Sequence, residues 1–236
     1  MREGSIVLVA GFAAGAFAAN CYVVAARSGE ECVVVDPGED AAAGVAALVA
    51  EHQLRPTAVV LTHGHLDHVW SAAQVCATYA VPCWIHPADR HLLSDPLAGL
   101  PAEWAAAVPL AGGLAEPADV RPFAATPGQD DRLQVAALDI RVVHTPGHTP
   151  GSVVCRLRGD DGGPELMLAG DLLFAGSVGR TDLPGGDHET MRTSLASRVL
   201  PLDDETVVLP GHGGRTTVGR EKASNPYLQD LETVRP

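Results

Sequence analysis

The sequence predicts an α/β fold in which two packed sheets are covered by helices. Short, apolar, β-branched segments typical of strands occur in both halves of the chain, and segments with helical spacing lie between them. The chain has 236 residues, of which 46% are hydrophobic, so it can bury the core that a layered fold requires. No linker or short repeat interrupts the pattern, and we expect a single domain over residues 1–236.

The first half of the chain is expected to begin with three strands. Residues 1–20 also resemble a signal peptide, but Glu3 and two glycines interrupt that pattern, so we prefer a strand there, followed by a loop of small residues. Asp40 is expected to cap the first helix with its side chain. The predicted strands are Ser5–Val9, Cys21–Ala25, Glu31–Val35, Thr57–Leu61 and Cys83–His86, and the predicted helical segments are 40–53, Val69–Tyr79 and Pro87–Leu93.

The second half begins with the least regular segment. Residues 95–120 are rich in Pro, Gly and Ala, and we expect a loop or lid with one turn around Trp104. A hairpin turn is expected at 160–163. The predicted strands are Arg132–Val135, Leu138–Val143, Ser152–Arg158, Glu165–Ala169 and Thr206–Leu209, and helices are expected over Asp187–Val199 and from Arg220 onward.

Composition excludes several classes of partner. The formal net charge of −13 argues against binding to nucleic acid or to an anionic membrane. No stretch reaches about 18 uninterrupted apolar residues, so no membrane span is expected. The five cysteines are odd in number and contain no CxxC pair, which indicates buried free thiols in a reducing compartment such as the cytoplasm.

Four potential metal ligands follow the predicted strand Thr57–Leu61. His63, His65, Asp67 and His68 come at the carboxyl end of this strand, where open α/β sheets bind their ligands. Residues two apart share a face of an extended chain, so His63 and His65 can bind one ion together. Asp67 and His68 are neighbours and should diverge, toward a second ion close to the first. Imidazole and carboxylate are ligands of zinc, iron and manganese.

Three later predicted strands also end in candidate ligands. His144 and His148 follow one strand, Asp171 follows another and His212 follows a third. A glycine precedes each of His148, Asp171 and His212, and it lets the backbone approach a crowded site. The same arrangement at four strand ends predicts a two-metal centre, although spacing alone does not choose between His144 and His148.

These motifs resemble the metallo-β-lactamase superfamily. The resemblance extends over nearly the whole chain and implies an αββα sandwich, with two packed mixed sheets flanked by helices and a two-metal centre at one edge. Within the superfamily the sequence is most similar to the short bacterial glyoxalase II (hydroxyacylglutathione hydrolase) group. The motifs are THGHLDH at 62–68, TPGHTPGS at 145–152, Gly170-Asp171 and PGHG at 210–213, with flanking matches from Asn20 to Leu228.

The resemblance also implies a role for each ligand. The first metal would be held by His63, His65 and His148, the second by Asp67, His68 and His212, and Asp171 would bridge them. The family ligand is the histidine of Gly-His-Thr, which selects His148 and leaves His144 a packing role. Zinc is the expected metal, with iron or manganese as alternatives. The histidines that match no ligand position are expected at the surface or in turns, and they are His52, His86, His91 and His188.

The implied activity is hydrolysis of a thioester of a low-molecular-weight thiol, of the S-D-lactoylglutathione type that arises in methylglyoxal detoxification. Two divalent ions would activate a water to hydroxide, and Asp67 would both ligate and orient it. Arg180 lies where these enzymes place a cation that contacts a glutathione carboxylate, although a structural salt bridge with Asp182 is an equal alternative. Only 24 residues follow His212, so the region with which larger glyoxalases II bind glutathione is missing, and the thiol stays open. We expect a monomer or small homo-oligomer.

Rival activities remain within the same superfamily. A mononuclear-iron persulfide dioxygenase also resembles the chain and shares the segment 179–182, and a lactone hydrolase could use the same hydroxide. The endings PGHG at 210–213 and Asn-Pro-Tyr at 225–227 favour glyoxalase II. The β-lactamases that give the superfamily its name differ at positions 67, 68 and 171, so the resemblance argues against antibiotic hydrolysis.

Overall fold

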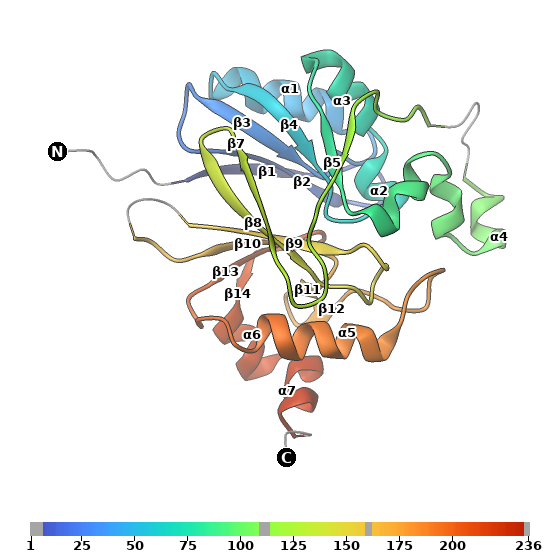
Figure 1. Cartoon of the computed structure of the whole chain (residues 1–236), viewed down its shortest axis with the longest axis vertical. Coiled ribbons are helices and arrows are strands. Elements are labelled where there is room, and N and C mark those ends of the chain that lie inside the picture. Colours follow the sequence, from blue (N-terminus) through green and yellow to red (C-terminus); the bar gives the residue numbers. More distant parts are fainter. Residues whose placement is uncertain (1–6, 109–113, 159–161, 234–236) are drawn as a thin grey trace.

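The computed structural model, which describes residues 7–108, 114–158 and 162–233, contains two mixed six-stranded sheets packed face to face. Helices cover the outer face of each sheet, with α1 and α3 above and α5, α6 and α7 below in the view of Figure 1. This confirms the predicted α/β class and the αββα sandwich. Within the described residues, no helix is both long and apolar enough to cross a membrane.

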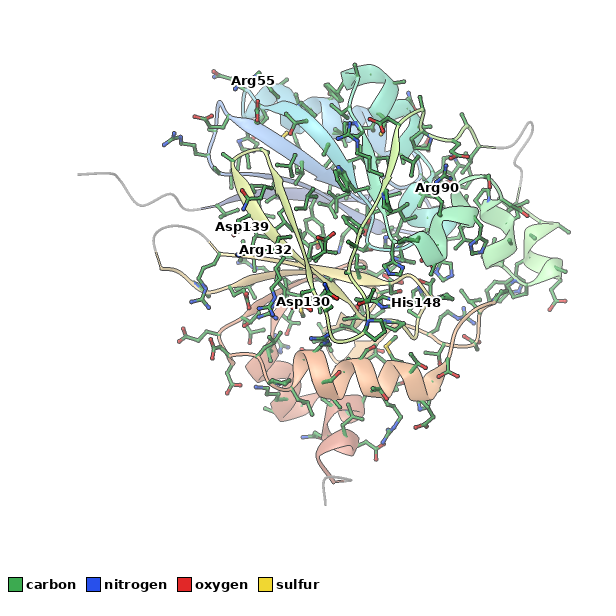
Figure 2. All side chains as sticks on the ribbon, in the orientation of Figure 1. Arg55, Arg90, Asp130, Arg132, Asp139 and His148 are labelled. Atoms are coloured by element: carbon green, nitrogen blue, oxygen red, sulfur yellow. The ribbon has the colours of Figure 1, made fainter. Side chains whose placement is uncertain are left out.

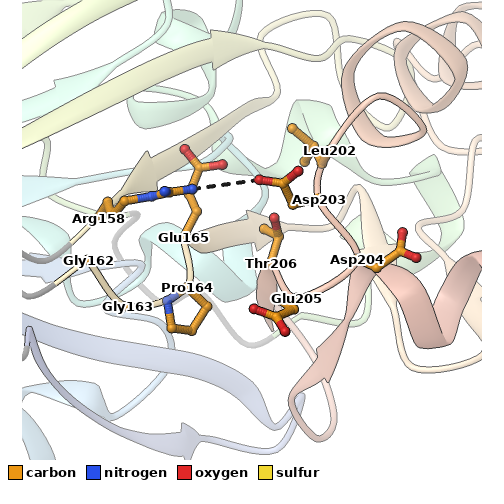
Figure 3. Close-up of a pocket in the computed structure, with 10 residues that line it drawn as sticks. All are labelled: Arg158, Gly162, Gly163, Pro164, Glu165, Leu202, Asp203, Asp204, Glu205 and Thr206. Carbon is orange, nitrogen blue, oxygen red and sulfur yellow. Dashed lines mark ion pairs between the residues drawn. The ribbon is translucent and has the colours of Figure 1, made fainter.

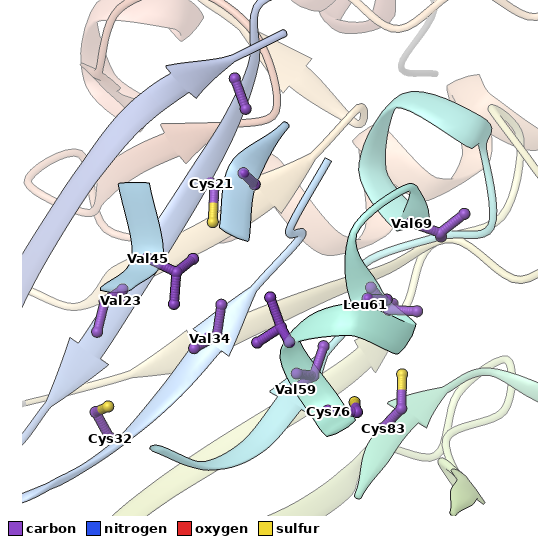
Figure 4. Packing of buried hydrophobic residues seen from close by; sticks show 14 of the residues in the cluster. Cys21, Val23, Cys32, Val34, Val45, Val59, Leu61, Val69, Cys76 and Cys83 are labelled. Carbon is purple, nitrogen blue, oxygen red and sulfur yellow. The ribbon is translucent and has the colours of Figure 1, made fainter. Parts of the chain in front are cut away.

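In the N-terminal sheet, β1, β2 and β3 pair antiparallel, and β3 also begins the parallel part of the sheet, which continues through β4, β5 and β6. Both faces are buried: Val34 packs under the helices whereas Val33 and Val35 face the second sheet, so the strand is apolar without alternation. Figure 4 shows the helix-covered side of this core. The strands are β1 Leu8–Ala14, β2 Ala19–Ala25, β3 Glu31–Val35, β4 Arg55–Val60, β5 Cys83–Ile85 and β6 Val120–Pro122, and the helices are α1 Ala41–Glu51, α2 Leu66–Val69 and α3 Ala72–Tyr79.

The C-terminal sheet runs in the order β14-β13-β10-β9-β8-β7. Its outer face carries Met167 and Val208, which pack against Leu195 and Leu228 of the covering helices. The strands are β7 Asp131–Val135, β8 Leu138–His144, β9 Val153–Leu157, β10 Leu166–Gly170, β13 Val207–Pro210 and β14 Thr216–Thr217, with a separate hairpin of β11 Leu173–Phe174 and β12 Ser177–Val178. The helices are α5 His188–Ser194, which continues as a π-helical turn over Leu195–Val199, α6 Val218–Ser224 and α7 Pro226–Thr233.

Several predicted boundaries are wrong for identifiable reasons. The first strand does not end at Val9 but continues through Gly11 to Ala14, where it pairs with β2 along its whole length. Gly11 is compatible with this strand because the Tyr22 ring packs where a Cβ would lie. The predicted helix Val69–Tyr79 is interrupted at residues 70–71, between α2 and α3. Ser5 and the turn residues 160–161 lie outside the described residues.

The predicted cap of the first helix is also wrong. Asp40 occupies the N-cap position but has a left-handed backbone, with φ 55°, and its side chain makes no capping hydrogen bond. The hydroxyl of Ser71 instead accepts the N–H of Ala41 at 3.2 Å. A residue distant in the sequence therefore caps α1, which local pattern could not reveal.

The described part of segment 95–120 has more secondary structure than the predicted loop, and the predicted turn around Trp104 is confirmed. Its described part contains the 3₁₀ turn Pro96–Gly99, the short helix α4 Ala102–Ala105 and the beginning of β6, and residues 109–113 lie outside the described residues. It follows the 3₁₀ segment Pro87–Leu93, which was predicted as a helical turn. The five cysteines are free and buried, as expected.

Candidate metal centre

The seven predicted ligands converge at one edge of the sandwich, where the carboxyl ends of β4, β8, β10 and β13 meet. Backbone hydrogen bonds join the two sheets there, from Val153 to Thr62 at 2.8 Å and from Asn20 to Gly211 at 2.7 Å. Figure 2 shows His148 at this boundary between the two halves of the molecule. The edge thus brings together residues from positions 63 to 212.

Candidate ligand atoms form three overlapping groups whose members lie within 4.8 Å of one another. These groups are His63, His65 and His148; His63, His68 and Asp171; and Asp67, His68 and His212. Two of them have the composition predicted for the two metals. Their roles as ligands remain predictions, but the geometry is compatible with two ions.

Asp171 lies between the two predicted sites. Its Oδ1 is 3.4 Å from Nε2 of His68, and its Oδ2 is 3.5 Å from Nε2 of His148 and 3.7 Å from Nε2 of His212. This is the placement that a bridging carboxylate needs. The expected divergence of Asp67 from His68 is wrong: Asp67 Oδ2 is 3.6 Å from His68 Nε2, and both residues belong to the same group on the first turn of α2.

Two glycines allow the strand ends to approach this closely. Gly170 has φ +47°, and a Cβ there would lie 2.5 Å from Oγ1 of Thr62. A Cβ on Gly211 would collide with the Asp171 carboxylate and would lie 2.8 Å from the His68 ring. Side chains at these positions would displace the candidate ligands, which accounts for the glycine before Asp171 and before His212.

Hydrogen bonds around the cluster fix which ring nitrogen of each histidine is free. The hydroxyl of Thr62 donates to Asp36 Oδ2 at 2.6 Å, so Nδ1 of His63 donates to that hydroxyl at 3.1 Å. Nδ1 of His68 donates to Asp36 Oδ2 at 3.1 Å, and Nδ1 of His148 donates to the carbonyl of Arg180 at 2.7 Å. Each of these histidines therefore turns Nε2 toward the centre, as metal-binding imidazoles do.

Titration of the cluster follows from burial and from neighbouring charges. Burial and the adjacent imidazoles lower the pKa of His63 well below its ordinary value and that of His65 to about 3. Burial opposes protonation of His68, but the Asp67 and Asp171 carboxylates outweigh it and raise the pKa of His68. The cluster therefore combines two imidazoles that burial keeps neutral, His63 and His65, with a His68 imidazole whose cationic form the carboxylates favour.

The cluster passes a physical test for cation binding. Nε2 of His63, His65 and His68 and Oδ1 of Asp171 are buried and have no hydrogen-bond partner in the described part of the chain. Nε2 of His68 and Oδ1 of Asp171 face each other at 3.4 Å. An unsatisfied buried polar atom typically costs about 1–3 kcal/mol, so the other two, Nε2 of His63 and of His65, are unfavourable unless they bind something. The atoms are nitrogen and oxygen acceptors, a donor set that suits a divalent transition metal.

His144 lies outside the three groups. Its Nε2 donates to the carbonyl of Pro150 at 2.9 Å, and its ring stacks on His86 with centroids 4.1 Å apart. The expectation that His86 is a surface or turn histidine is wrong, because His86 is buried and donates to the carbonyl of Ala125 at 3.0 Å.

Arg180 forms the predicted salt bridge and also lies at the cleft above the cluster. Its guanidinium donates to the Asp182 carboxylate at 2.7 and 2.8 Å, and this hydrogen bond lowers the pKa of Asp182 to about 2. The same guanidinium lies 5.0 Å from the centroid of the Trp104 ring and lines the cleft above the cluster. The salt bridge is therefore present, whereas contact with substrate stays a prediction.

Two buried carboxylates that support the ligand loops were missed by the sequence analysis. Neither Asp36 nor Asp89 was predicted to bear on the site, yet both are buried beside the ligand loops. Asp89 accepts the N–H of Gly64 at 2.9 Å, the hydroxyl of Thr149 at 2.6 Å and the N–H of Gly151 at 2.6 Å. A carboxylate at the end of β3, next to the ligand-bearing strand, is a signal that could have identified Asp36.

The cluster opens into a cleft of about 440 Å³. Another hollow, of about 540 Å³, lies between the β9–β10 connection and the loop before β13. Figure 3 shows that second hollow, with Arg158 paired to Asp203 at 3.8 Å. None of the three ligand groups contributes to it, so the cleft above the cluster is the candidate site.

Relatives of known sequence match this chain over almost its full length. The uncharacterized protein Rv2581c of Mycobacterium tuberculosis is 43% identical over 95% of this chain and 99% of its own. The hydroxyacylglutathione hydrolase GloC of Haemophilus influenzae is 32% identical over 90% of this chain and 94% of its own.

Solved structures agree with the fold. The B3 metallo-beta-lactamase BLEG-1 superposes with a TM-score of 0.77 at 33% identity, over 94% of this chain and 99% of its own. The di-iron-bound form of TTHA1623 superposes with a TM-score of 0.71 at 35% identity, over 94% of this chain and all of its own. A family model described as the metallo-beta-lactamase superfamily matches residues 14–212, which span every candidate ligand, and this chain belongs to that superfamily.

Proposed function

We propose that this protein is a metal-dependent hydrolase that uses a binuclear centre to cleave a thioester of a low-molecular-weight thiol, of the S-D-lactoylglutathione type. The observation that carries the proposal is the set of converging nitrogen and oxygen atoms at the floor of a cleft, four of them buried without a hydrogen-bond partner in the described part of the chain. The similarity to GloC supports the choice of thioester. Zinc is the proposed metal, and the similarity to a di-iron protein keeps iron as an alternative.

Each proposed role follows from a position in the cluster. We assign His63, His65 and His148 to one ion, Asp67, His68 and His212 to the other, and Asp171 to both. When bound, the two cations would supply Lewis acidity and a water of lowered pKa. The protein's own contribution is to hold the ligands, orient the nucleophile and admit the substrate.

Asp67 is the proposed orienting residue. Burial favours its neutral form, but His68 and the hydrogen bond from His212, at 3.1 Å, hold the pKa of Asp67 below its usual range. Asp67 is therefore ionised at neutral pH and can accept a hydrogen bond from the attacking water. Its carboxylate also lines the cleft, within reach of a substrate.

The cleft favours a substrate with a good leaving group. Among the described residues that line it there is no Lys, Tyr or Cys that could protonate a departing group. A thiolate leaves without such help, whereas an amine requires a general acid. The five buried free thiols further support a cytoplasmic protein, and we propose one domain that acts on a small molecule as a monomer or small homo-oligomer.

The test begins with metal content. Elemental analysis of protein loaded with zinc or iron(II) should approach two ions per chain. The loaded protein should also hydrolyse S-D-lactoylglutathione, which is measured as release of the free thiol. A stoichiometry firmly at one ion would refute the binuclear model. Oxygen uptake and sulfite release with a glutathione persulfide would instead support the dioxygenase, and ring opening of a lactone would support the lactonase.

A second candidate is β-lactam hydrolysis. The resemblance argued against it, but the 33% identity to a B3 metallo-beta-lactamase weakens that argument. The same loaded protein should therefore be tested with a chromogenic β-lactam. Turnover of the β-lactam faster than of every thioester would replace the proposed function.

A further inference from the structure

The cleft above the cluster has an unusually apolar wall. Two of its residues, Phe17 and Trp104, are about half exposed, at 49% and 46%. Among the described residues the only other large hydrophobic side chain so exposed is Tyr227, which lies outside the cleft. The apolar lining comes from three separate stretches of the chain and comprises Phe17, Leu100, Trp104, Phe174, Val178 and Leu183.

Single exposed aromatic side chains are common on protein surfaces, but an apolar patch that surrounds a candidate reactive centre marks a binding site. Phe17 lies in the loop between β1 and β2, and Trp104 lies in α4, far apart in the sequence. The cleft between them opens onto His65, Asp67 and His148. A molecule that reaches the cluster therefore passes between apolar walls.

The cationic side chain of the cleft is already neutralised. Arg180 is the sole Lys or Arg among the described lining residues. Two of its N–H groups donate to Asp182, and its guanidinium lies against the Trp104 ring. A carboxylate of the substrate would have to compete with Asp182 for this fork, in a chain whose formal net charge is −13.

We propose that the cleft binds an uncharged, apolar group of the thioester substrate, and that Trp104 is its main specificity-determining residue. This inference rests on the proposed function and names its substrate class. The group could belong to the acyl side or to the thiol side of the scissile bond. In either case the carboxylates of glutathione contribute little to binding.

A panel of thioesters, assayed with the metal-loaded protein, tests the proposed substrate class. It also tests which side of the scissile bond carries the apolar group. One arm keeps the lactoyl group and varies the thiol among glutathione, N-acetylcysteamine and benzyl thiol. The other arm keeps N-acetylcysteamine and compares lactoyl with phenylacetyl, with each rate normalised to hydrolysis by hydroxide alone. Burying one aromatic group in an apolar cleft predicts a KM lower by about tenfold or more in at least one arm.

Variants connect this preference to particular residues. Trp104→Ala should raise KM for the apolar thioester about tenfold and change KM for the glutathione thioester less than about twofold. Tyr227→Ala is the matched control, since it removes an equally exposed aromatic ring from α7, and it should change neither KM. Asp182→Ala frees the Arg180 guanidinium and should lower KM for the glutathione thioester. A melting temperature measured for each variant excludes loss of the fold.

Binding of thioether analogues, which cannot be hydrolysed, separates this inference from the proposed function. Calorimetric titration should show tighter binding of S-benzyl-N-acetylcysteamine than of S-methylglutathione, with the difference lost in Trp104→Ala. If that preference holds while no thioester is hydrolysed, the proposed function alone falls. If the glutathione compounds bind best, or if Trp104→Ala weakens all compounds equally, this inference is wrong.

Discussion

Oδ2 of Asp36 lies 3.1 Å from Nδ1 of His68, and the same oxygen accepts the hydroxyl of Thr62, which in turn accepts Nδ1 of His63. One buried carboxylate thus sets the tautomer of a histidine in each proposed metal site. Oδ1 of Asp36 also accepts the N–H of Thr62 at 2.8 Å, which fixes the end of β4. Asp36 holds this position with a left-handed backbone, φ 49°, which aspartate tolerates better than most residues.

Asp36→Ala should therefore weaken both metal sites. Loss of a residue that orients metal-binding histidines commonly reduces metal affinity about 10–100-fold. The measurement is competition for the metal against a chromophoric chelator, with the absorption spectrum of the cobalt(II)-loaded protein as a report on ligand geometry. Unchanged affinity for both ions and an unchanged cobalt spectrum would contradict the assigned role.

Asp89→Asn should affect the first site more than the second. The Asp89 carboxylate joins the loop that contains Gly64 to the loop that contains Thr149 and Gly151, and these loops carry three ligands of the proposed first site. An amide in its place presents an N–H to donors that need an acceptor, so we expect a loss of about 1–3 kcal/mol in the free energy of unfolding. Chelator competition should show weaker binding of one ion and near-normal binding of the other.

Glu221→Gln provides the matched control for both variants. Glu221 is equally buried and accepts hydrogen bonds from Thr216, Gly176 and Asn225, none of which is a predicted ligand or adjoins one. It should lose stability and keep its metals. If Glu221→Gln and Asp89→Asn lose metal equally, the effect of Asp89 is one of general stability.

The sequence predicted what depends on local pattern. The ligand motif at 62–68 and the apolar runs before it place four polar groups at a strand end, and the layer order followed from strands and helices in both halves. Long-range contacts were not predictable in the same way. The cap of α1 by Ser71, the position of Asp89 between two loops and the stacking of His86 on His144 depend on tertiary packing.

Short strands were missed for a related reason. β6, β11, β12 and β14 have two or three residues each, too few for an alternating pattern, and they exist because a neighbouring strand supplies hydrogen bonds. The hairpin of β11 and β12 still bears on the site, since Phe174 and Val178 line the cleft.

The choice of His148 over His144 gives a direct comparison of two nearby histidines. We expect His148→Ala to lose at least one ion and most activity, because Nε2 of His148 lies 2.8 Å from Nδ1 of His65 and 3.5 Å from Asp171. His144→Ala should retain most metal, since the His144 ring contacts His86 and the Pro150 carbonyl. The metal content of both variants, purified and loaded in parallel, decides which of the two histidines is a ligand. Equal loss would refute the assignment of His148.

The stacked pair of His86 and His144 predicts a dependence of stability on pH that is independent of the metal ligands. Burial and the neighbouring imidazole of His144 lower the pKa of His86 below its ordinary value of 6.5. As the pH falls below that value, the unfolded chain binds a proton at His86 and the folded chain does not, so the free energy of unfolding decreases. Above the ordinary pKa, the contribution of His86 to the free energy of unfolding is fully present. Asp89 and the Ala125 carbonyl partly oppose the shift, but the net pKa of His86 stays lowered, so His86 is protonated in the folded protein only at a lower pH than in the unfolded chain.

His86→Gln should flatten this dependence. Glutamine can still donate to the Ala125 carbonyl, but it does not titrate. When the pH is lowered from 7, the melting temperature of His86→Gln should therefore fall less than that of the wild type. His188→Gln removes an imidazole from an exposed position on α5 and is the matched control. All three proteins share the histidines of the metal cluster, so differences between their pH profiles isolate His86. Parallel profiles for the wild type and His86→Gln would show that the stacked pair does not couple folding to protonation.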